Sequence, residues 1–253
     1  MSAEEFRFLA EKLRPYSDYL YLHVMGEPLL HPQLAQLLKI AKALNFSVVV
    51  TTNGTLLPKT QEVLLSCGCL HKVHVSLHSF EANEGGNLSD YVRGCTEFAK
   101  KAAEKGILIN FRLWNLDGEN TRGKNERNGE LLEHLHEAFA ASWKENTGGF
   151  RVQNGVFVQY AERFEWPDIG KEELRSHGLC YALRKQLAVL CDGSVVPCCL
   201  DHEGDLSLGN LFEKSLEEIL QSPLAMQVLQ GVSGRGSLPE LCRRCGYAQR
   251  FSK

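Results

Sequence analysis

Four cysteines in the last third of the chain have a spacing that suits metal binding. Cys242 and Cys245 form a Cys-x-x-Cys pair, Cys198 follows a predicted turn at Gly193, and Cys180 lies further upstream. A Cys-x-x-Cys turn places two sulfurs on one metal centre, and two more thiolates complete either a zinc site or a 4Fe-4S cluster. The spacing does not separate these two possibilities, and a purely structural role for the thiols is a third.

The other five of the nine cysteines are not expected to bind this metal. They are Cys67, Cys69, Cys95, Cys191 and Cys199. Cys199 should point to the opposite side of a strand from Cys198, because side chains alternate along strands. Cys67 and Cys69 precede a predicted strand, so they should lie at the end of the sheet away from a site built on strand ends.

A second set of polar residues lies where predicted strands end. Gly26-Glu27-Pro28 follows an apolar run at residues 19–25. Gly26 lets the backbone approach a ligand or take a positive φ, and Pro28 holds the exit extended, so Glu27 is presented at a fixed place. Its carboxylate would suit an ammonium group. Taken alone, about half of such tripeptides would be ordinary loops with no ligand.

Later strand ends add further hydrogen-bonding side chains. In chain order these are Thr51, Thr52, Asn53, Ser76, His78, Arg112 and Asn115. Because ligands bind at the carboxyl ends of strands in parallel βα arrays, these groups should line one rim. Singly, Asn53 could serve only a turn and His78 could be an ordinary rim histidine, but four successive strands ending in polar groups favour a site.

The hydrophobic pattern predicts the elements that position both sets of residues. Strands are predicted at residues 19–25, 46–50, 72–77, 107–113 and 156–160. Helices are predicted at residues 2–13, 31–41, 59–66, 89–105 and 130–143. The first three strands recur at a period of about 27 residues, the length of one βα unit in a parallel sheet. We therefore expect an α/β fold, an incomplete TIM-like βα barrel of about five parallel strands, over residues 1–165.

The pattern changes near Trp166-Pro167. Residues 187–190 and 195–196 flank the turn Asp192-Gly193 and predict a β-hairpin rather than another βα unit. Short helices are predicted at residues 216–220 and 223–229. Residues 166–253 are therefore expected to form a small second domain that holds the four cysteines.

Composition excludes several classes of function. The 253 residues carry 28 basic and 31 acidic side chains, interleaved along the chain, with a formal net charge of -3. No basic stripe is available for nucleic acid, and no apolar run approaches the ~18 residues that span a bilayer. The acidic N-terminus does not resemble a signal peptide. We expect a cytoplasmic protein without a membrane or nucleic-acid partner, whose clustered thiols bind metal.

Together these motifs resemble the radical S-adenosylmethionine (radical SAM) family with a C-terminal SPASM or twitch extension. Gly26-Glu27-Pro28 is similar to the Gly-Glu-Pro region that contacts the amino group of S-adenosylmethionine in relatives. The resemblance implies a cofactor-binding set of Gly26, Glu27, Pro28, Asn53, Ser76, His78 and Arg112. It also implies that Cys180, Cys198, Cys242 and Cys245 hold one auxiliary 4Fe-4S cluster, as in the twitch form of the extension.

The resemblance further implies a reaction. Family members reduce S-adenosylmethionine to release a 5'-deoxyadenosyl radical, which abstracts hydrogen from a substrate. A peptide or protein is the favoured substrate, the loosely patterned residues 115–129 are a candidate for recognising it, and an electron donor such as flavodoxin or ferredoxin is implied.

One departure from the family pattern bears on activity. The family's Cys-x3-Cys-x2-Cys motif lies between its first strand and first helix, but here the first helix opens the chain and the first cysteine is Cys67. The chain as given is therefore expected to be an N-terminally shortened, inactive version, with residues 19–25 as an exposed edge strand and Phe6, Leu9 and Leu13 packed on the sheet. The alternative is a non-catalytic 4Fe-4S or zinc-binding protein that retains the fold.

Overall fold

The structure is a computed structural model that describes residues 1–82, 86–116 and 124–251. The chain separates into two compact units. The first, here called the sheet unit, is Ser17–Arg163. The second, here called the C-terminal unit, combines Met1–Tyr16 with Phe164–Lys253.

The sheet unit is built on five parallel strands, the number predicted from the sequence. They are β1 (Tyr19–Leu22), β2 (Ser47–Thr52), β3 (Leu70–Ser76), β4 (Leu108–Leu116) and β7 (Val156–Glu162), paired in that order. Strand β1 lies at one edge of the sheet, as expected, and exposes Tyr19 and Tyr21. At the other edge, β6 (Gly149–Gln153) and β5 (Lys144–Asn146) add an antiparallel hairpin that the sequence pattern did not predict.

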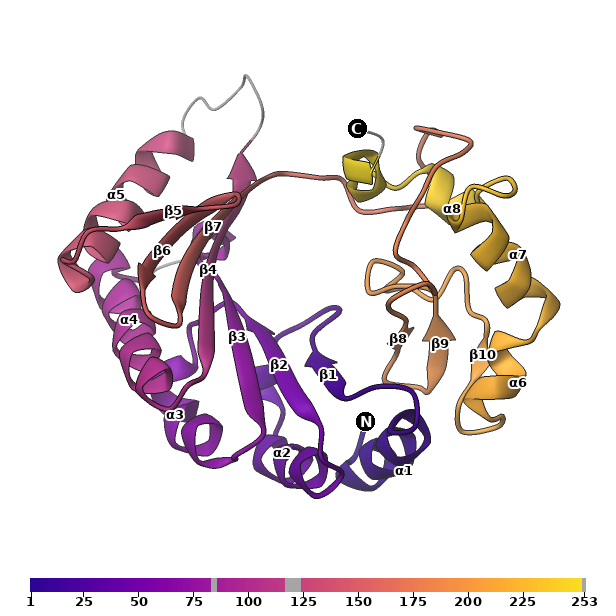
Figure 1. Ribbon diagram of the computed structural model, residues 1–253, viewed down its shortest axis with the longest axis horizontal. Coiled ribbons are helices and arrows are strands. Elements are labelled where there is room, and N and C mark those ends of the chain that lie inside the picture. The colour runs from indigo at the N-terminus through magenta and orange to yellow at the C-terminus, as the bar shows by residue number, and fades with distance from the viewer. Residues whose placement is uncertain (83–85, 117–123, 252–253) are drawn as a thin grey trace. The chain divides into compact units, whose positions relative to one another are not determined.

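Helices cover one face of this sheet (Figure 1). They are α2 (Leu34–Ala43), α3 (Leu57–Ser66), α4 (Leu88–Glu104) and α5 (Lys124–Ala138), with short 3-10 turns η1 (Pro28–Leu30) and η2 (Leu77–Ala82). Strand β4 shows why the sheet has two unlike faces. Ile109, Phe111 and Leu113 are fully buried, whereas the alternate positions Asn110 and Arg112 lie on the opposite face. The apolar face packs under the helices and the other face carries polar groups.

The C-terminal unit contains smaller elements. A three-stranded antiparallel sheet joins β8 (Ala188–Val189), β9 (Ser194–Val196) and β10 (Gly209–Asn210). The helices are α1 (Ala3–Leu13), α6 (Leu216–Leu220), α7 (Pro223–Val232) and α8 (Glu240–Arg243), followed by the 3-10 turn η3 (Tyr247–Phe251). The predicted hairpin across Asp192-Gly193 is confirmed, because β8 pairs with β9 across that turn.

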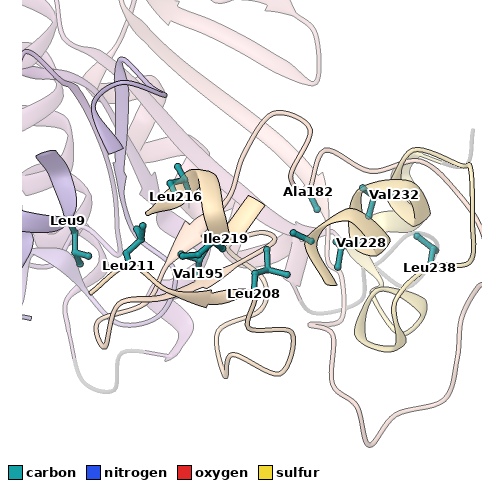
Figure 2. Close-up of a cluster of buried hydrophobic side chains, with 11 residues drawn as sticks. Leu9, Ala182, Val195, Leu208, Leu211, Leu216, Ile219, Val228, Val232 and Leu238 are labelled. Atoms are coloured by element: carbon teal, nitrogen blue, oxygen red, sulfur yellow. The ribbon is translucent and has the colours of Figure 1, made fainter. Parts of the chain in front are cut away.

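Helix α1 packs in the C-terminal unit, not where the sequence placed it. Leu9 is buried in a hydrophobic cluster with Val195, Leu208, Leu211, Leu216, Ile219, Val228, Val232 and Leu238 (Figure 2). The Lys12 Nζ donates to the carbonyls of Leu211 and Lys214, and the rings of Phe8 and Phe212 stack. This differs from the predicted packing of α1 on the sheet and from its place in a domain of residues 1–165. Helical periodicity identifies an apolar face but does not identify the surface that covers it.

Helix α5 differs from its predicted range. It begins at Lys124 and ends at Ala138, six residues earlier and five residues earlier than the apolar pattern indicated. Part of the loosely patterned segment thus belongs to this helix, and residues 117–123 lie outside the described residues. No helix in the described parts of the chain has the length and apolar character needed to cross a membrane.

Candidate functional site

The turn after β1 adopts an unusual backbone conformation. Val24 has a φ of 99° and Gly26 a φ of 86°. A positive φ is strained for a β-branched residue such as Val24, and strain of this kind clusters at functional sites. Gly26 meets the predicted need for a positive φ, and a Cβ added there would meet nothing within 4 Å. The backbone of this turn is therefore accessible on one side.

The Glu27 carboxylate ties this turn to the end of the next strand. Its Oε2 accepts a hydrogen bond from the backbone N–H of Asn53 at 2.7 Å, and its Oε1 accepts from the N–H of Leu29 at 3.1 Å. Pro28 occupies the first position of η1, for which Glu27 is the N-cap. A carboxylate offers about four lone-pair sites. Glu27 thus fixes the rim and keeps acceptor capacity for a ligand.

Asn53 and Ser76 also hold their loops in place. The Asn53 Oδ1 accepts from the N–H of Thr55 at 2.9 Å and from its hydroxyl at 2.7 Å. The half-buried Tyr91 donates its hydroxyl to the Asn53 carbonyl at 2.6 Å, and the Ser79 hydroxyl donates to the Ser76 carbonyl at 2.6 Å. The side chain of Asn53 therefore makes the local turn that its sequence allows, and both residues lie at strand ends.

His78 and Arg112 meet at the ends of β3 and β4. Ser76 is in register with Arg112. The His78 Nδ1 lies 3.1 Å from the Arg112 carbonyl and 3.3 Å from the backbone nitrogen of Trp114. The Arg112 guanidinium carbon stands 4.3 Å from the centroid of the Trp114 ring. The structure thus brings Glu27 together with Asn53, and Ser76 and His78 together with Arg112.

A layer of polar side chains that the sequence analysis did not single out lies on the same sheet face as Arg112. The Asn110 Nδ2 lies 3.3 Å from the His74 Nδ1 and donates to the Gln159 Oε1 at 2.9 Å. The Asn110 Oδ1 is buried and has no hydrogen-bond partner within the described residues. We call His74, Asn110, Arg112 and Gln159 the polar layer. The sequence does carry a signal for this layer. Side chains two residues apart in a strand lie on the same face, which places His74 on the face of Ser76 and Asn110 on the face of Arg112.

Two histidines near Arg112 are held neutral. Burial lowers the pKa of His23 to about 4, and the nearby Arg112 guanidinium lowers it further. Burial likewise lowers the pKa of His74 to about 2, with Arg112 and then Lys72 adding to the effect. Both imidazoles are therefore uncharged at neutral pH, so they do not add positive charge to a face that already holds Arg112.

The four predicted ligand cysteines lie near one another in the C-terminal unit. Cys180 donates its backbone N–H to the Val232 carbonyl at 3.0 Å, Cys198 follows β9, Cys242 lies in α8 and Cys245 just after it. None of these thiols is in a disulfide. Burial raises the pKa of Cys242 to about 12, and the neighbouring Cys180 and Cys245 raise it further. Burial also raises the pKa of Cys198.

The surroundings of these thiols fit an anionic thiolate-ligated cluster. Arg175 lies close enough to Cys242 and Cys245 to favour their thiolates. Its Nη1 donates to the Ala248 carbonyl at 2.9 Å, but its Nε and Nη2 are buried without an acceptor in the described residues. Within those residues, no three His, Cys, Asp or Glu side chains are grouped tightly enough for one metal ion. A cubane instead spreads its four thiolates over separate irons.

Two models of known protein families match this chain. Residues 1–122 match the radical SAM superfamily, and residues 180–246 match SPASM, an iron-sulfur cluster-binding domain. The chain thus carries a radical SAM match followed by a SPASM match. The SPASM match begins at Cys180 and ends one residue after Cys245, so it spans all four predicted ligands.

Individual proteins agree with this assignment. The chain is 24% identical over 274 residues to the antilisterial bacteriocin subtilosin biosynthesis protein AlbA of Bacillus subtilis (strain 168), covering 98% of this chain and 59% of AlbA. It thus spans less than two thirds of that relative. The structure of anSMEcpe with bound AdoMet superposes with a TM-score of 0.63 at 12% identity, covering 100% of this chain and 82% of that one. Streptococcus suis SuiB bound to precursor peptide SuiA gives 0.57 at 16% identity, with coverages of 98% and 64%. These likenesses support the partial βα barrel fold.

Proposed function

We propose that this chain binds S-adenosylmethionine at the carboxyl-end rim of its sheet, binds one auxiliary 4Fe-4S cluster in its SPASM domain, and serves in the modification of a peptide or protein. The observation that carries the proposal is the bond from the Asn53 N–H to the Glu27 carboxylate. It makes the Gly-Glu-Pro turn and the end of β2 a single, fixed surface.

The rim residues have distinct tasks in this proposal. The lone pairs of Glu27 that remain receive the ammonium group, and the open side of Gly26 lets the cofactor approach the backbone. Pro28 holds the exit of the turn. The remaining contacts come from Asn53, Ser76, His78 and Arg112. The neutral states of His23 and His74 avoid repulsion of a cationic sulfonium, and the unmet Asn110 Oδ1 offers an acceptor.

The chemistry comes from the cofactor. When bound, S-adenosylmethionine would supply hydrogen-abstraction chemistry, and the electron that it needs would come from a donor such as flavodoxin or ferredoxin. The protein positions both partners and keeps water out. Cys180, Cys198, Cys242 and Cys245 would hold the auxiliary cluster, and the unpartnered Nε and Nη2 of Arg175 near Cys242 would favour its negative charge.

A peptide or protein substrate is supported by two of the similar proteins. AlbA is named for the biosynthesis of a bacteriocin, and SuiB is described with a bound precursor peptide. These names describe those proteins, and a peptide substrate for this chain is part of the proposal.

A non-catalytic role is the second candidate, favoured by one observation. Residues 1–66 of the printed sequence contain no cysteine, so the Cys-x3-Cys-x2-Cys motif of the family is not among them. A protein that keeps only the SPASM cluster would retain the fold and bind a partner without cleaving S-adenosylmethionine.

The experiment compares two anaerobically reconstituted proteins. Residues 1–253 alone should hold about four irons per chain, as one cubane does, and release no 5'-deoxyadenosine with a strong reductant. The same chain with an added N-terminal strand and Cys-x3-Cys-x2-Cys segment should hold about eight irons and release 5'-deoxyadenosine. Failure of the extended protein to form this product would favour the non-catalytic role. Its formation by residues 1–253 alone would point to a different ligand set.

A further inference from the structure

Two cysteines outside the proposed cluster site form a close pair in the sheet unit. Cys67 caps the C-terminus of α3, and Cys69 precedes the first residue of β3. Their sulfurs are 3.6 Å apart. Because β3 begins here, the pair lies at the amino end of the strand, opposite the rim that carries Glu27 and Asn53.

The turn at Gly68 creates this proximity. Gly68 has a φ of 67°, a conformation that glycine adopts without steric cost at the end of a helix. The chain therefore reverses between the two cysteines, and their side chains face each other. Lys42 holds the turn, because its Nζ donates to the Gly68 carbonyl at 2.7 Å. A disulfide has an S–S length of about 2.05 Å, so rotation of the two side chains would have to close the remaining gap.

The two thiols are chemically unequal. The hydrogen bond from the Cys69 thiol lowers the pKa of Cys67 to about 6, and backbone N–H groups of Cys69 and Leu70 lower it further against the effect of burial. The same bond and burial raise the pKa of Cys69. Cys67 is half-exposed, whereas Cys69 is buried, with its sulfur 3.4 Å from the Leu38 carbonyl. Cys67 is thus suited to be a nucleophile and Cys69 a resolving thiol.

The surface beside Gly68 and Cys69 has room for a small molecule. An open hollow of about 310 Å³ is lined by Lys42, Ser47, Gly68, Cys69 and His71 among others. The Lys42 ammonium on its wall suits a carboxylate. A low-molecular-weight disulfide that carries carboxylates, such as oxidised glutathione, has this chemistry.

We infer that Cys67 and Cys69 are a redox-active dithiol that exchanges with small-molecule disulfides. The Cys67 thiolate attacks one sulfur of the disulfide, forming a mixed disulfide and releasing one thiolate, which takes a proton from solvent. Cys69 loses its proton to solvent and attacks Cys67, closing the Cys67–Cys69 bond and releasing the second thiol. Two electrons pass from the protein dithiol to the disulfide. The new bond would join the end of α3 to the start of β3.

The sequence allows this pair to be followed separately from the other cysteines. Trypsin releases residues 60–72, which contain only Cys67 and Cys69, and residues 94–100, which contain only Cys95. Cys95 is fully buried, and burial raises its pKa to about 12, so it is an internal control. The reconstituted full chain is equilibrated anaerobically with mixtures of reduced and oxidised glutathione, alkylated, digested and weighed by mass spectrometry.

The inference predicts that peptide 60–72 converts to its internal disulfide while the Cys95 peptide stays reduced and the iron content stays constant. Cys69→Ser should accumulate glutathione on Cys67 at least tenfold faster than Cys67→Ser does on Cys69. In the unsubstituted chain at pH 7, Cys67 should react with iodoacetamide at least tenfold faster than Cys95.

A peptide 60–72 that stays a dithiol at every ratio of reduced to oxidised glutathione would overturn the inference, and so would equal rates in these comparisons. Loss of iron at the C-terminal cysteines would instead bear on the proposed cluster.

Discussion

The rim of the sheet unit and the cysteine region of the C-terminal unit hold their functional groups in different ways. At the rim, backbone hydrogen bonds fix the turns, as between Glu27 and Asn53, and a ladder of five parallel strands lies beneath them. In the C-terminal unit, the strands are only two or three residues long. Four cysteines, one buried and three half-buried, lie there near the unpartnered donors of Arg175.

This difference indicates how each region becomes ordered. The rim is organised by the protein alone, so a ligand adds little to its folding. A region with short strands and clustered thiols takes part of its stability from the metal, because metal binding there is folding free energy. Substitutions in the two regions should therefore have different consequences, and the following experiments test that contrast.

Loss of any proposed cluster ligand should have the largest effect. Replacing Cys180, Cys198, Cys242 or Cys245 by Ala should remove most of the iron and loosen the C-terminal unit, while the sheet unit stays folded. Iron and sulfide analysis with hydrogen exchange of both units measures this. Cys191→Ala and Cys199→Ala are the matched controls and should keep the iron. A colourless protein with stoichiometric zinc would contradict the iron assignment.

Leu9→Ala should have the next largest effect, on stability. The side chain is 3% exposed and packs in the cluster of the C-terminal unit. Deleting such a leucine typically costs about 2–5 kcal/mol in the free energy of unfolding. Hydrogen exchange should rise around β9 and α7 and stay unchanged in β2 and β3. The exposed Glu11→Ala on the same helix is the control. Faster exchange in the sheet strands instead would support the packing of α1 on the sheet that the sequence predicted.

Glu27→Ala should weaken cofactor binding at the rim. A charged hydrogen bond of this kind is worth roughly 1.5–3 kcal/mol, so affinity for S-adenosylmethionine should fall about 10- to 150-fold in a protein that carries the family's three-cysteine segment. Equilibrium dialysis under anaerobic conditions measures this affinity. Because Glu27 also accepts from Asn53 and Leu29, hydrogen exchange of these amides reports the structural share of the loss. The exposed Glu62→Ala is the control, and unchanged affinity for the Glu27 variant would make the turn purely structural.

Much of the sheet unit could be predicted because its apolar residues repeat with the period of the elements that they build. The α3 helix was placed within two residues, and five parallel strands were expected and are present. The β5–β6 hairpin was missed, since all three residues of β5 are exposed and give no apolar alternation. In the C-terminal unit, the α6 helix was placed without error, because Leu216, Ile219 and Leu220 recur at helical spacing.

The polar positions of the site were only partly accessible from sequence. Strand ends can be located by pattern, which is how Glu27, Asn53 and His78 were predicted as site residues. The contact of Asn110 with both His74 and Gln159 depends on the register of three strands that are far apart in the chain. The partner of α1 likewise depends on long-range packing. Local periodicity carries neither kind of information.

The smallest effect expected is a pH dependence confined to the sheet unit. His23 and His74 have folded pKa values of about 4 and about 2, below the ordinary value of 6.5. Below about pH 6.5 the unfolded chain takes up protons that the folded chain does not, so stability falls as the pH decreases. At pH 5 each histidine should lower the free energy of unfolding by roughly 1–2 kcal/mol relative to pH 7.5.

Urea unfolding of wild type and of His23→Gln and His74→Gln at both pH values measures this. Each variant should lose less stability on acidification than wild type, since glutamine takes up no proton, and hydrogen exchange should place the change beside β1 for His23 and in β3 for His74. An equal loss in all three proteins would mean that these imidazoles are protonated in the folded state, and that the polar layer carries more positive charge than a cationic cofactor would favour.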